Sequence, residues 1–231
     1  MEILPIAHFR SPLKSKFGIP RQSGLVDSLT GSIVFEPPYR HMEAFRGIED
    51  FDFLWLIWEF SENSGKRKEE SGKRLLTVRP PRLGGNQRMG VFATRSPFRP
   101  NSLGLSCVRF DRIEEDPELG PVIYVKGADL MDGTPIYDIK PYVVYADSHP
   151  EARSGFVDQT DWKPLAVDIP DYLAKLFPAT DLDSLRQTLA QDPRPSYHDD
   201  PQRIYGMPFG DYDVRFRVEA EIVIVVDCVR L

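Results

Sequence analysis

The sequence has little cysteine and no long apolar run. Its two cysteines, Cys107 and Cys228, each lie inside an apolar, strand-like run without metal-binding spacing around it. They provide no disulfide framework, so the sequence favours a reducing compartment, the cytoplasm. The first residues contain no continuous apolar segment of the signal-peptide kind, and no later run approaches the ~20 residues of a membrane span. We therefore expect a cytoplasmic protein without a membrane anchor.

Several catalytic and nucleotide-binding motifs are also missing. The sequence contains no G-x-G-x-x-G, G-x-x-x-x-G-K-[ST], G-x-S-x-G, H-E-x-x-H or C-x-x-C. A nucleotide cofactor, if one is bound, is therefore not held as in a Rossmann fold. The four histidines lie in unrelated contexts, so the sequence indicates neither a metal site nor a catalytic base.

Acidic residues are absent from one long stretch of an otherwise acidic protein. The 231-residue chain has 35 Asp and Glu against 29 Lys and Arg, yet the forty residues 71–110 contain no acid. This window holds eight basic residues, of which seven are arginines. Because a guanidinium group binds carboxylates and phosphates through paired hydrogen bonds and stacks on rings, we expect an anionic, planar ligand.

Proline and glycine alternate with these arginines over residues 77–106. Proline fixes the backbone, and glycine allows the backbone to approach a ligand closely. We interpret the segment as a shaped loop and strand that form a ligand site. The alternative is a solvated basic face with ordinary turn residues.

Short strand-like runs dominate the first 145 residues. Strands are expected at residues 3–9, 31–36, 51–60, 103–113 and 122–128, with one brief helix that ends at Gly47. Such a series predicts an antiparallel barrel or a curled sheet rather than βαβ units. The run FDFLWLIWEF at residues 51–60 is continuously apolar, so we expect it to be buried on both faces or to lie at a subunit interface.

The composition changes after Tyr145, where a polar stretch indicates a linker. Two short helices are predicted over residues 168–177 and 180–191, the second with Thr180 as its N-cap, and a β-hairpin closes the chain. We therefore divide the chain into a first domain at residues 1–146 and a small α+β domain at residues 147–231.

Six motifs are spread over most of the chain. They are PRQ at 20–22, FDFLWLIWEF at 51–60, GGNQRMGVFATRSPFRPNSLGLS at 84–106, DGTP at 132–135, DIKPY at 138–142 and AQDPRP at 190–195. Together they closely resemble the TrmO family, also known as YaeB-like or TsaA-like proteins. Two positions depart from the family pattern: Ser61 stands where a histidine is expected, and Ser102-Leu103 replaces Pro-Ile.

This resemblance implies a reaction, a fold and partners. TrmO proteins are S-adenosylmethionine-dependent tRNA methyltransferases that methylate N6 of threonylcarbamoyladenosine next to the anticodon of threonine tRNA. The implied fold is mainly β, with a single-sheeted antiparallel β-barrel that binds S-adenosylmethionine and a small α+β C-terminal domain. A homodimer with the cofactor near its interface is expected, and no metal.

The resemblance also implies site residues. The family's cofactor contacts fall on Pro20, Arg21, Gln22, Ser61, Glu62, Arg95, Leu105, Asp132, Gly133, Thr134 and Pro135. The predicted tRNA-binding residues are Arg79, Arg82, Arg88 and Arg99, and of these we place Arg79 and Arg82 outside the cofactor pocket. Asp132 is able to accept hydrogen bonds from a ribose, but an Asp before Gly is also a common turn former. The catalytic group is not identified by the sequence.

Two other functions stay open at this point. One is a catalytically inactive module that binds tRNA or a nucleotide, and Ser61 is its best support. The other is a methyltransferase of the same fold that acts on another RNA or on a small metabolite.

Overall fold

The structure is a computed structural model that describes residues 2–61, 69–70, 73–74, 76–83, 87–160, 162–195 and 200–231. For residues 69–70, 73–74 and 82 it describes the backbone alone. Two predicted site positions therefore lie outside the described part, Glu62 as a whole and Arg82 as a side chain.

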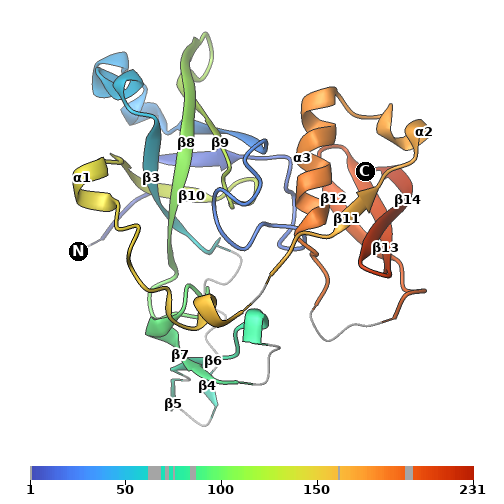
Figure 1. Cartoon of the computed structure of the whole chain (residues 1–231). Helices are drawn as coiled ribbons and strands as arrows, with labels where there is room; N and C mark the ends of the chain where they lie inside the picture. Colours follow the sequence, from blue (N-terminus) through green and yellow to red (C-terminus); the bar gives the residue numbers. More distant parts are fainter. Residues whose placement is uncertain are drawn as a thin grey trace.

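The described chain contains short strands, three α-helices and several 3-10 turns (Figure 1). The strands are β1 (Ala7–Arg10), β2 (Thr30–Phe35), β3 (Phe53–Glu59), β4 (Glu69–Glu70), β5 (Lys73–Arg74), β6 (Thr77–Val78), β7 (Met89–Gly90), β8 (Leu103–Asp116), β9 (Gly120–Lys126), β10 (Pro135–Pro141), β11 (Ala166–Asp168), β12 (Tyr205–Phe209), β13 (Tyr212–Glu219) and β14 (Ile222–Arg230). The α-helices are α1 (Val144–Asp147), α2 (Asp171–Ala174) and α3 (Ala179–Ala190). The 3-10 helices are η1 (Pro37–Tyr39), η2 (Met42–Phe45), η3 (Ile48–Asp50), η5 (Pro81–Leu83), η6 (Val91–Ala93) and η7 (Gly155–Gln159). None of these helices is long and apolar enough to cross a membrane.

Six antiparallel strands form the first part of the fold. They pair in the order β1-β10-β3-β8-β9-β2, and β2 pairs again with β1, so the strands form a closed barrel. The short strands without βαβ patterning predicted this antiparallel arrangement, and the prediction of a mainly β protein is confirmed. The helix expected before Gly47 is instead the two 3-10 helices η1 and η2, and η3 follows Gly47.

The strand β3 corrects one expectation about burial. Leu54, Leu56 and Trp58 point into the barrel and are buried, whereas the side chains between them are half-buried on the outer face. Burial on both faces is therefore not seen within the single chain, and the alternative, a position at a subunit interface, stays a prediction. Aromatic rings pack against one another on the outer face. The ring centroids of Trp55 and Tyr142 are 6.1 Å apart.

The C-terminal part is a four-stranded sheet in the order β11-β14-β13-β12. Helix α3 packs on it through the fully buried Leu185 and Leu189, and β13 and β14 form the predicted closing hairpin. The predicted helix at 168–177 is instead the end of β11 followed by α2. The predicted N-cap Thr180 is also wrong, because the helix already begins at Ala179, and Pro178 holds the N-cap position without a side-chain hydrogen bond.

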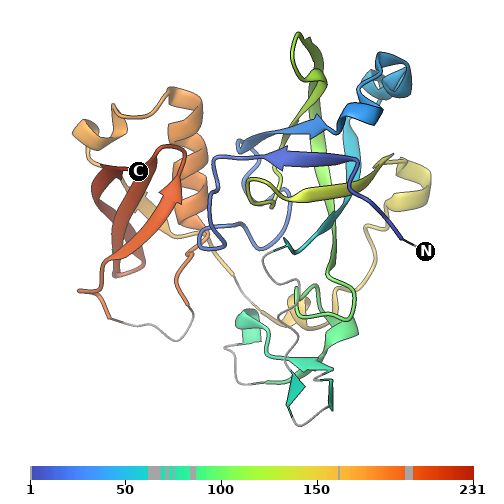
Figure 2. The ribbon, with the colours of Figure 1, turned by 180° about the vertical axis from the view of Figure 1, so that it is seen from behind.

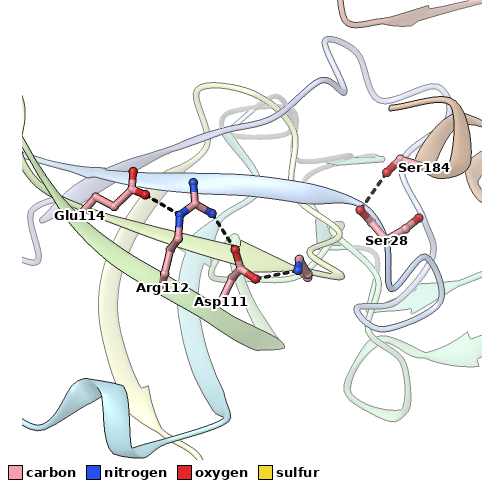
Figure 3. A network of polar contacts seen from close by, with 6 residues as sticks. Ser28, Asp111, Arg112, Glu114 and Ser184 are labelled. Atoms are coloured by element: carbon pink, nitrogen blue, oxygen red, sulfur yellow. Dashed lines mark hydrogen bonds and ion pairs between the residues drawn. The ribbon is translucent and has the colours of Figure 1, made fainter. Parts of the chain in front are cut away.

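The loop from Pro12 to Leu29 joins the two parts, as Figure 2 shows from behind. Leu13 and Leu29 share one hydrophobic cluster with the C-terminal sheet and α3. The Ser184 hydroxyl donates a hydrogen bond to the carbonyl oxygen of Ser28 at 2.8 Å (Figure 3). The loop that carries residues 20–22 is therefore held between the barrel and the C-terminal part.

Gly18 shows how tightly this loop is packed. Its φ is +97°, and an added Cβ would lie 2.3 Å from the sulfur of Met207 on β12. Any other residue here would be strained and would collide with the C-terminal sheet. The backbone that leads from Gly18 to Pro20 is therefore held in one conformation.

Candidate active site

A groove of about 1210 Å³ lies where the acid-free window folds. Its lining comes from the loop at residues 21–22, from segments between residues 76 and 102, and from the linker at residues 153–157. Six arginines line it: Arg21, Arg79, Arg88, Arg95, Arg99 and Arg153. Asp and Glu are absent from its described lining. We call it the arginine groove.

Figures 1 and 2 show how distant segments meet there. The linker passes beneath the barrel, and its helix η7 lies beside η6 in both views (Figures 1 and 2). The small sheet of β6 and β7 forms another part of the lining through Thr77 and Val78. Residues far apart in the sequence therefore enclose one positively charged space.

Asp111 and Glu114, which follow the window, pair with bases of the barrel. On β8, Arg112 donates hydrogen bonds at 2.7 Å to both Asp111 and Glu114, and Lys126 of β9 lies 2.6 Å from Asp111 (Figure 3). The hydrogen bond from Lys126 holds the pKa of Asp111 below its ordinary value, and Arg112 adds to this.

Arg95 and Gln22 meet inside the groove. The Arg95 Nη1 donates a hydrogen bond to the Gln22 Oε1, and the Gln22 Nε2 donates to the carbonyl oxygen of Arg21 at 2.5 Å. The guanidinium group is otherwise exposed to solvent. The structure thus brings together three of the predicted cofactor contacts, from two segments that are distant in sequence.

Asp129 lies behind this pair and was missed by sequence reasoning. The Trp58 Nε1 donates to the Ser106 hydroxyl at 2.9 Å, and that hydroxyl donates to the Asp129 carboxylate at 2.6 Å. Burial raises the pKa of Asp129, and the opposing influences include the Ser106 hydrogen bond, the charge of Arg95 and the backbone amide of Ser23. The sequence feature that could have identified Asp129 is a single carboxyl between two apolar residues, Ala128 and Leu130, both of which are buried.

The Asp132 turn is held by contacts within the protein. The Asp132 Oδ1 accepts a hydrogen bond from the backbone amide of Ser11, and its Oδ2 binds the Lys14 ammonium, both at 3.0 Å. Gly133 has a φ of +78°, which a left-handed turn requires. These contacts favour the turn-forming role of Asp132, and neither residue is among those that line the groove.

The remaining cofactor positions are distributed around this region. Pro20 and Thr134 are buried, Ser61 is half-buried two residues after the end of β3, and Pro135 begins β10. Leu105 is 56% exposed on β8, next to Ser106. Because neighbouring side chains on a strand point to opposite faces, Leu105 lies on the face away from Asp129. The cofactor contacts of these residues stay predictions.

The predicted tRNA-binding arginines differ in what they contact. Arg79 and Arg88 are exposed, and Arg88 donates a hydrogen bond to the Thr77 hydroxyl at 3.2 Å. Arg79 lines the same groove as Arg95, and its position outside the cofactor pocket stays a prediction. Arg99 is half-buried and donates to the carbonyl oxygens of Thr94 at 3.0 Å and Ser96 at 3.3 Å, which indicates a structural role.

Fold and groove together define a class of protein. A mainly β protein whose groove is lined by arginines and free of described acids is suited to bind an anionic ligand such as a nucleotide or a nucleic acid. No group of three or more His, Cys, Asp or Glu that could hold a metal ion occurs among the residues that the structure describes.

Comparison with known proteins identifies the family. The model of the tRNA-methyltransferase O N-terminal domain matches residues 8–148, and that of the TrmO C-terminal domain matches residues 171–231. The chain belongs to the TrmO family, as its motifs predicted.

Individual relatives agree with this assignment. The chain is 40% identical over 222 residues to the tRNA (adenine(37)-N6)-methyltransferase of Escherichia coli K12, which covers 92% of this chain and 91% of the relative. It is 49% identical over 176 residues to the protein of that name from Eikenella corrodens, with 76% and 95% covered. The crystal structure of TrmO from Pseudomonas aeruginosa matches with a TM-score of 0.76 and 31% identity over 99% of this chain and 97% of the other.

Proposed function

We propose that this chain is an S-adenosylmethionine-dependent tRNA (adenine37-N6)-methyltransferase. The observation that carries the proposal is the arginine groove in which Arg21, Gln22 and Arg95 meet, in a chain of the TrmO family. Relatives of 40% and 49% identity bear this enzyme name. The substrate nucleoside that we propose is threonylcarbamoyladenosine next to the anticodon of threonine tRNA.

The residues of the groove suit the chemistry of S-adenosylmethionine. Its methionyl carboxylate matches the guanidinium fork of Arg95 or Arg21, and the Gln22 amide adds further polar groups. The groove of about 1210 Å³ exceeds the roughly 300–1,000 Å³ of common ligand pockets, which leaves space for a nucleotide beside the cofactor. Bound S-adenosylmethionine supplies a methyl group on a positively charged sulfonium. The remaining arginines are available for the threonyl carboxylate and for phosphates.

The protein's part in the reaction is to bind, orient and exclude water. The groove-lining residues that the structure describes include no carboxylate, imidazole or thiol. They therefore hold the two reactants in line rather than supply a base, and such positioning alone lowers a barrier substantially. The group that takes the proton from N6 stays unassigned.

We also propose a homodimer with the cofactor site near its interface. Leu105 is a predicted cofactor contact, but it points to the face of β8 opposite to Ser106, whose hydroxyl binds Asp129. Leu105 pairs with Ile57 of β3 on an outer face that also carries the half-buried Trp55. In a dimer, this face of one chain is able to complete the groove of the other.

The finer division of the chain is part of the same proposal. Residues 1–146 form the cofactor-binding barrel domain, and residues 147–231 form the small C-terminal domain. The barrel strands all precede residue 146, and the four-stranded sheet with α3 follows it, which supports the division. An enzyme that modifies tRNA is expected to act in the cytoplasm.

The test is methyl transfer by the purified protein to threonine tRNA that carries threonylcarbamoyladenosine. Mass spectrometry of the nucleosides should show methylation at N6, and the same product should be missing from cells that lack the gene. S-adenosylmethionine binding without transfer would indicate an inactive binding module. Transfer to a different nucleoside would indicate a methyltransferase with another substrate.

A further inference from the structure

Two solvent-exposed phenylalanine rings line the arginine groove. Phe92 of η6 is 74% exposed and Phe98 is 49% exposed, and both line the groove. A single exposed apolar side chain is common on protein surfaces. Two rings on one short segment, both lining a groove with six arginines, form a local concentration that indicates a binding surface.

Hydrogen bonds hold the loop that carries these rings. The Thr94 hydroxyl donates to the carbonyl oxygen of Val91 at 2.9 Å, and the Ser96 hydroxyl accepts the backbone amide of Phe98 at 3.2 Å. Arg99 binds two carbonyl oxygens of the same loop. The exposure of Phe98 is therefore built into an ordered loop, which lowers the entropic cost of binding a ligand there.

The linker contributes to the same surface. Arg153 and Phe156 line the arginine groove, and η7 lies beside η6 in both ribbon views (Figures 1 and 2). The backbone amide of Ser154 donates to Asp158 at 2.7 Å, which fixes the start of η7. Arg153 has no ion-pair partner among the described residues. The linker thus adds an exposed cation and a further ring to the groove.

Exposed rings beside several guanidinium groups match the chemistry of single-stranded RNA. Proteins bind unpaired nucleotides by stacking bases on aromatic side chains while cations contact the phosphates. The same groove of a second copy fits less well, because two such grooves face to face would oppose charges of the same sign.

We propose that Phe92 and Phe98 form a stacking platform for unpaired nucleotides of the tRNA anticodon loop, and that Arg153 of the linker contacts the RNA backbone beside it. This inference rests on the proposed function and extends it, because it assigns an RNA-reading role to two rings of the motif at residues 84–106 and to Arg153 of the linker, which are not among the predicted tRNA-binding residues. The platform lies next to Arg95, so it also determines which nucleotide reaches the cofactor side of the groove.

The test measures binding of an anticodon stem-loop RNA to the full-length protein by fluorescence anisotropy over a series of salt concentrations. Phe92→Ala and Phe98→Ala should each weaken binding about 5- to 150-fold, the usual range for loss of one stacked base, without changing the salt slope. Phe92→Trp should retain binding, because a larger ring still stacks. Arg153→Ala should instead lower the slope of log affinity against log salt by about 0.7, the value for one phosphate of a single strand.

Three controls keep the result specific. Tyr172 on α2 is 66% exposed and lies outside the groove lining, so Tyr172→Ala should leave RNA affinity unchanged. S-adenosylmethionine affinity by calorimetry and the melting temperature should stay at the wild-type value in both phenylalanine variants. Light scattering should show an unchanged oligomeric mass.

The outcomes separate this inference from the proposed function. A wild-type protein that neither methylates the tRNA nor binds S-adenosylmethionine would overturn the proposed function itself. A wild-type protein that methylates, with Phe92→Ala and Phe98→Ala variants that bind RNA as tightly, would overturn the platform alone. Variants that change the oligomeric mass and leave RNA affinity intact would assign the rings to contact between two copies, which also overturns it.

Discussion

The Ser106 hydroxyl donates a hydrogen bond of 2.6 Å to the Asp129 carboxylate and so connects β8 to the segment before the Asp132 turn. Asp129 also accepts the backbone amide of Ser23 and faces the charge of Arg95. Asp129 therefore contacts β8, the strand of Leu105, and it interacts with Arg95. Ser23 connects it to the neighbouring residues 20–22, and the chain itself connects it to the turn at 132–135. We interpret Asp129 as a residue that positions these segments.

Replacing Asp129 separates its charge from its hydrogen bonds. Asp129→Asn keeps an oxygen that accepts the Ser106 hydroxyl but removes the negative charge beside Arg95, so we expect S-adenosylmethionine affinity to fall by about tenfold, or ~1.4 kcal/mol. Asp129→Ala also leaves buried donors unsatisfied, so the free energy of unfolding should fall by about 1–3 kcal/mol. Calorimetry and urea denaturation measure the two effects. Wild-type affinity in both variants would show that Asp129 positions nothing.

The raised pKa of Asp129 gives stability a defined pH dependence. Because burial favours the neutral carboxyl in the folded state, its contribution to stability is fully present below the ordinary pKa of 3.8. It is lost as the pH rises through the higher folded-state pKa. The variant Asp129→Asn cannot ionise, so the difference in unfolding free energy, variant minus wild type, should grow with pH in that window and then level off. Urea denaturation at a series of pH values checks this, and a constant difference contradicts it.

Leu105 tests the proposed dimer. Leu105→Glu places a charge on the exposed outer face of β8, so a dimer that buries this face should dissociate. Light scattering should then show the mass of a monomer, and calorimetry should show weaker S-adenosylmethionine binding at the same protein concentration. Tyr172→Ala is again the control for an exposed side chain elsewhere. An unchanged mass together with weaker cofactor binding would place Leu105 in the cofactor site of its own chain.

The sequence predicted an arginine-rich ligand site because the charge of each side chain follows from its residue type alone. The acid-free window identified the arginine groove before the fold was known, and the short alternating strands predicted the antiparallel sheet. The predicted meeting of Gln22 and Arg95 came from the family motifs, since no local pattern relates residues on such distant segments.

Other features depend on tertiary contacts and were not predictable from local patterns. Asp129 becomes a positioning residue only because β8 brings Ser106 next to it. Arg99 looked like an exposed cation, but the turn at residues 94–99 folds its guanidinium onto two carbonyl oxygens. The linker looked merely polar, and its path beneath the barrel places Arg153 in the groove (Figure 1).

Two arginines of the groove should respond differently to replacement. Arg79 is exposed in the groove, so Arg79→Ala should lower the slope of log tRNA affinity against log salt by about 0.9, with little change in stability. Arg99→Ala removes two loop hydrogen bonds and should lower the free energy of unfolding by about 1–2 kcal/mol, with a smaller effect on the slope. Salt titration and urea denaturation of both variants check this. Equal slopes in wild type and Arg79→Ala would assign that side chain another task.

Arg95 is the residue whose replacement should affect cofactor binding most. Its guanidinium is exposed in the groove and already oriented by Gln22, so it is prepared to bind a carboxylate through two hydrogen bonds. Arg95→Ala should weaken S-adenosylmethionine binding by roughly 2 to 4 kcal/mol, about 30- to 1000-fold. Arg95→Lys should recover only part of this, because a point charge cannot reproduce the planar fork.

The Gln22 contact makes this prediction sharper. If Gln22 acts by orienting Arg95, the loss from Gln22→Ala should largely disappear in the Arg95→Ala background, so the double variant should bind S-adenosylmethionine no worse than Arg95→Ala alone. Calorimetry on the four proteins of this cycle measures the coupling, and melting temperatures should stay close to wild type because Arg95 is exposed. Fully additive losses would mean that each side chain contacts the cofactor independently. Early unfolding of Arg95→Ala would make Arg95 a structural residue instead.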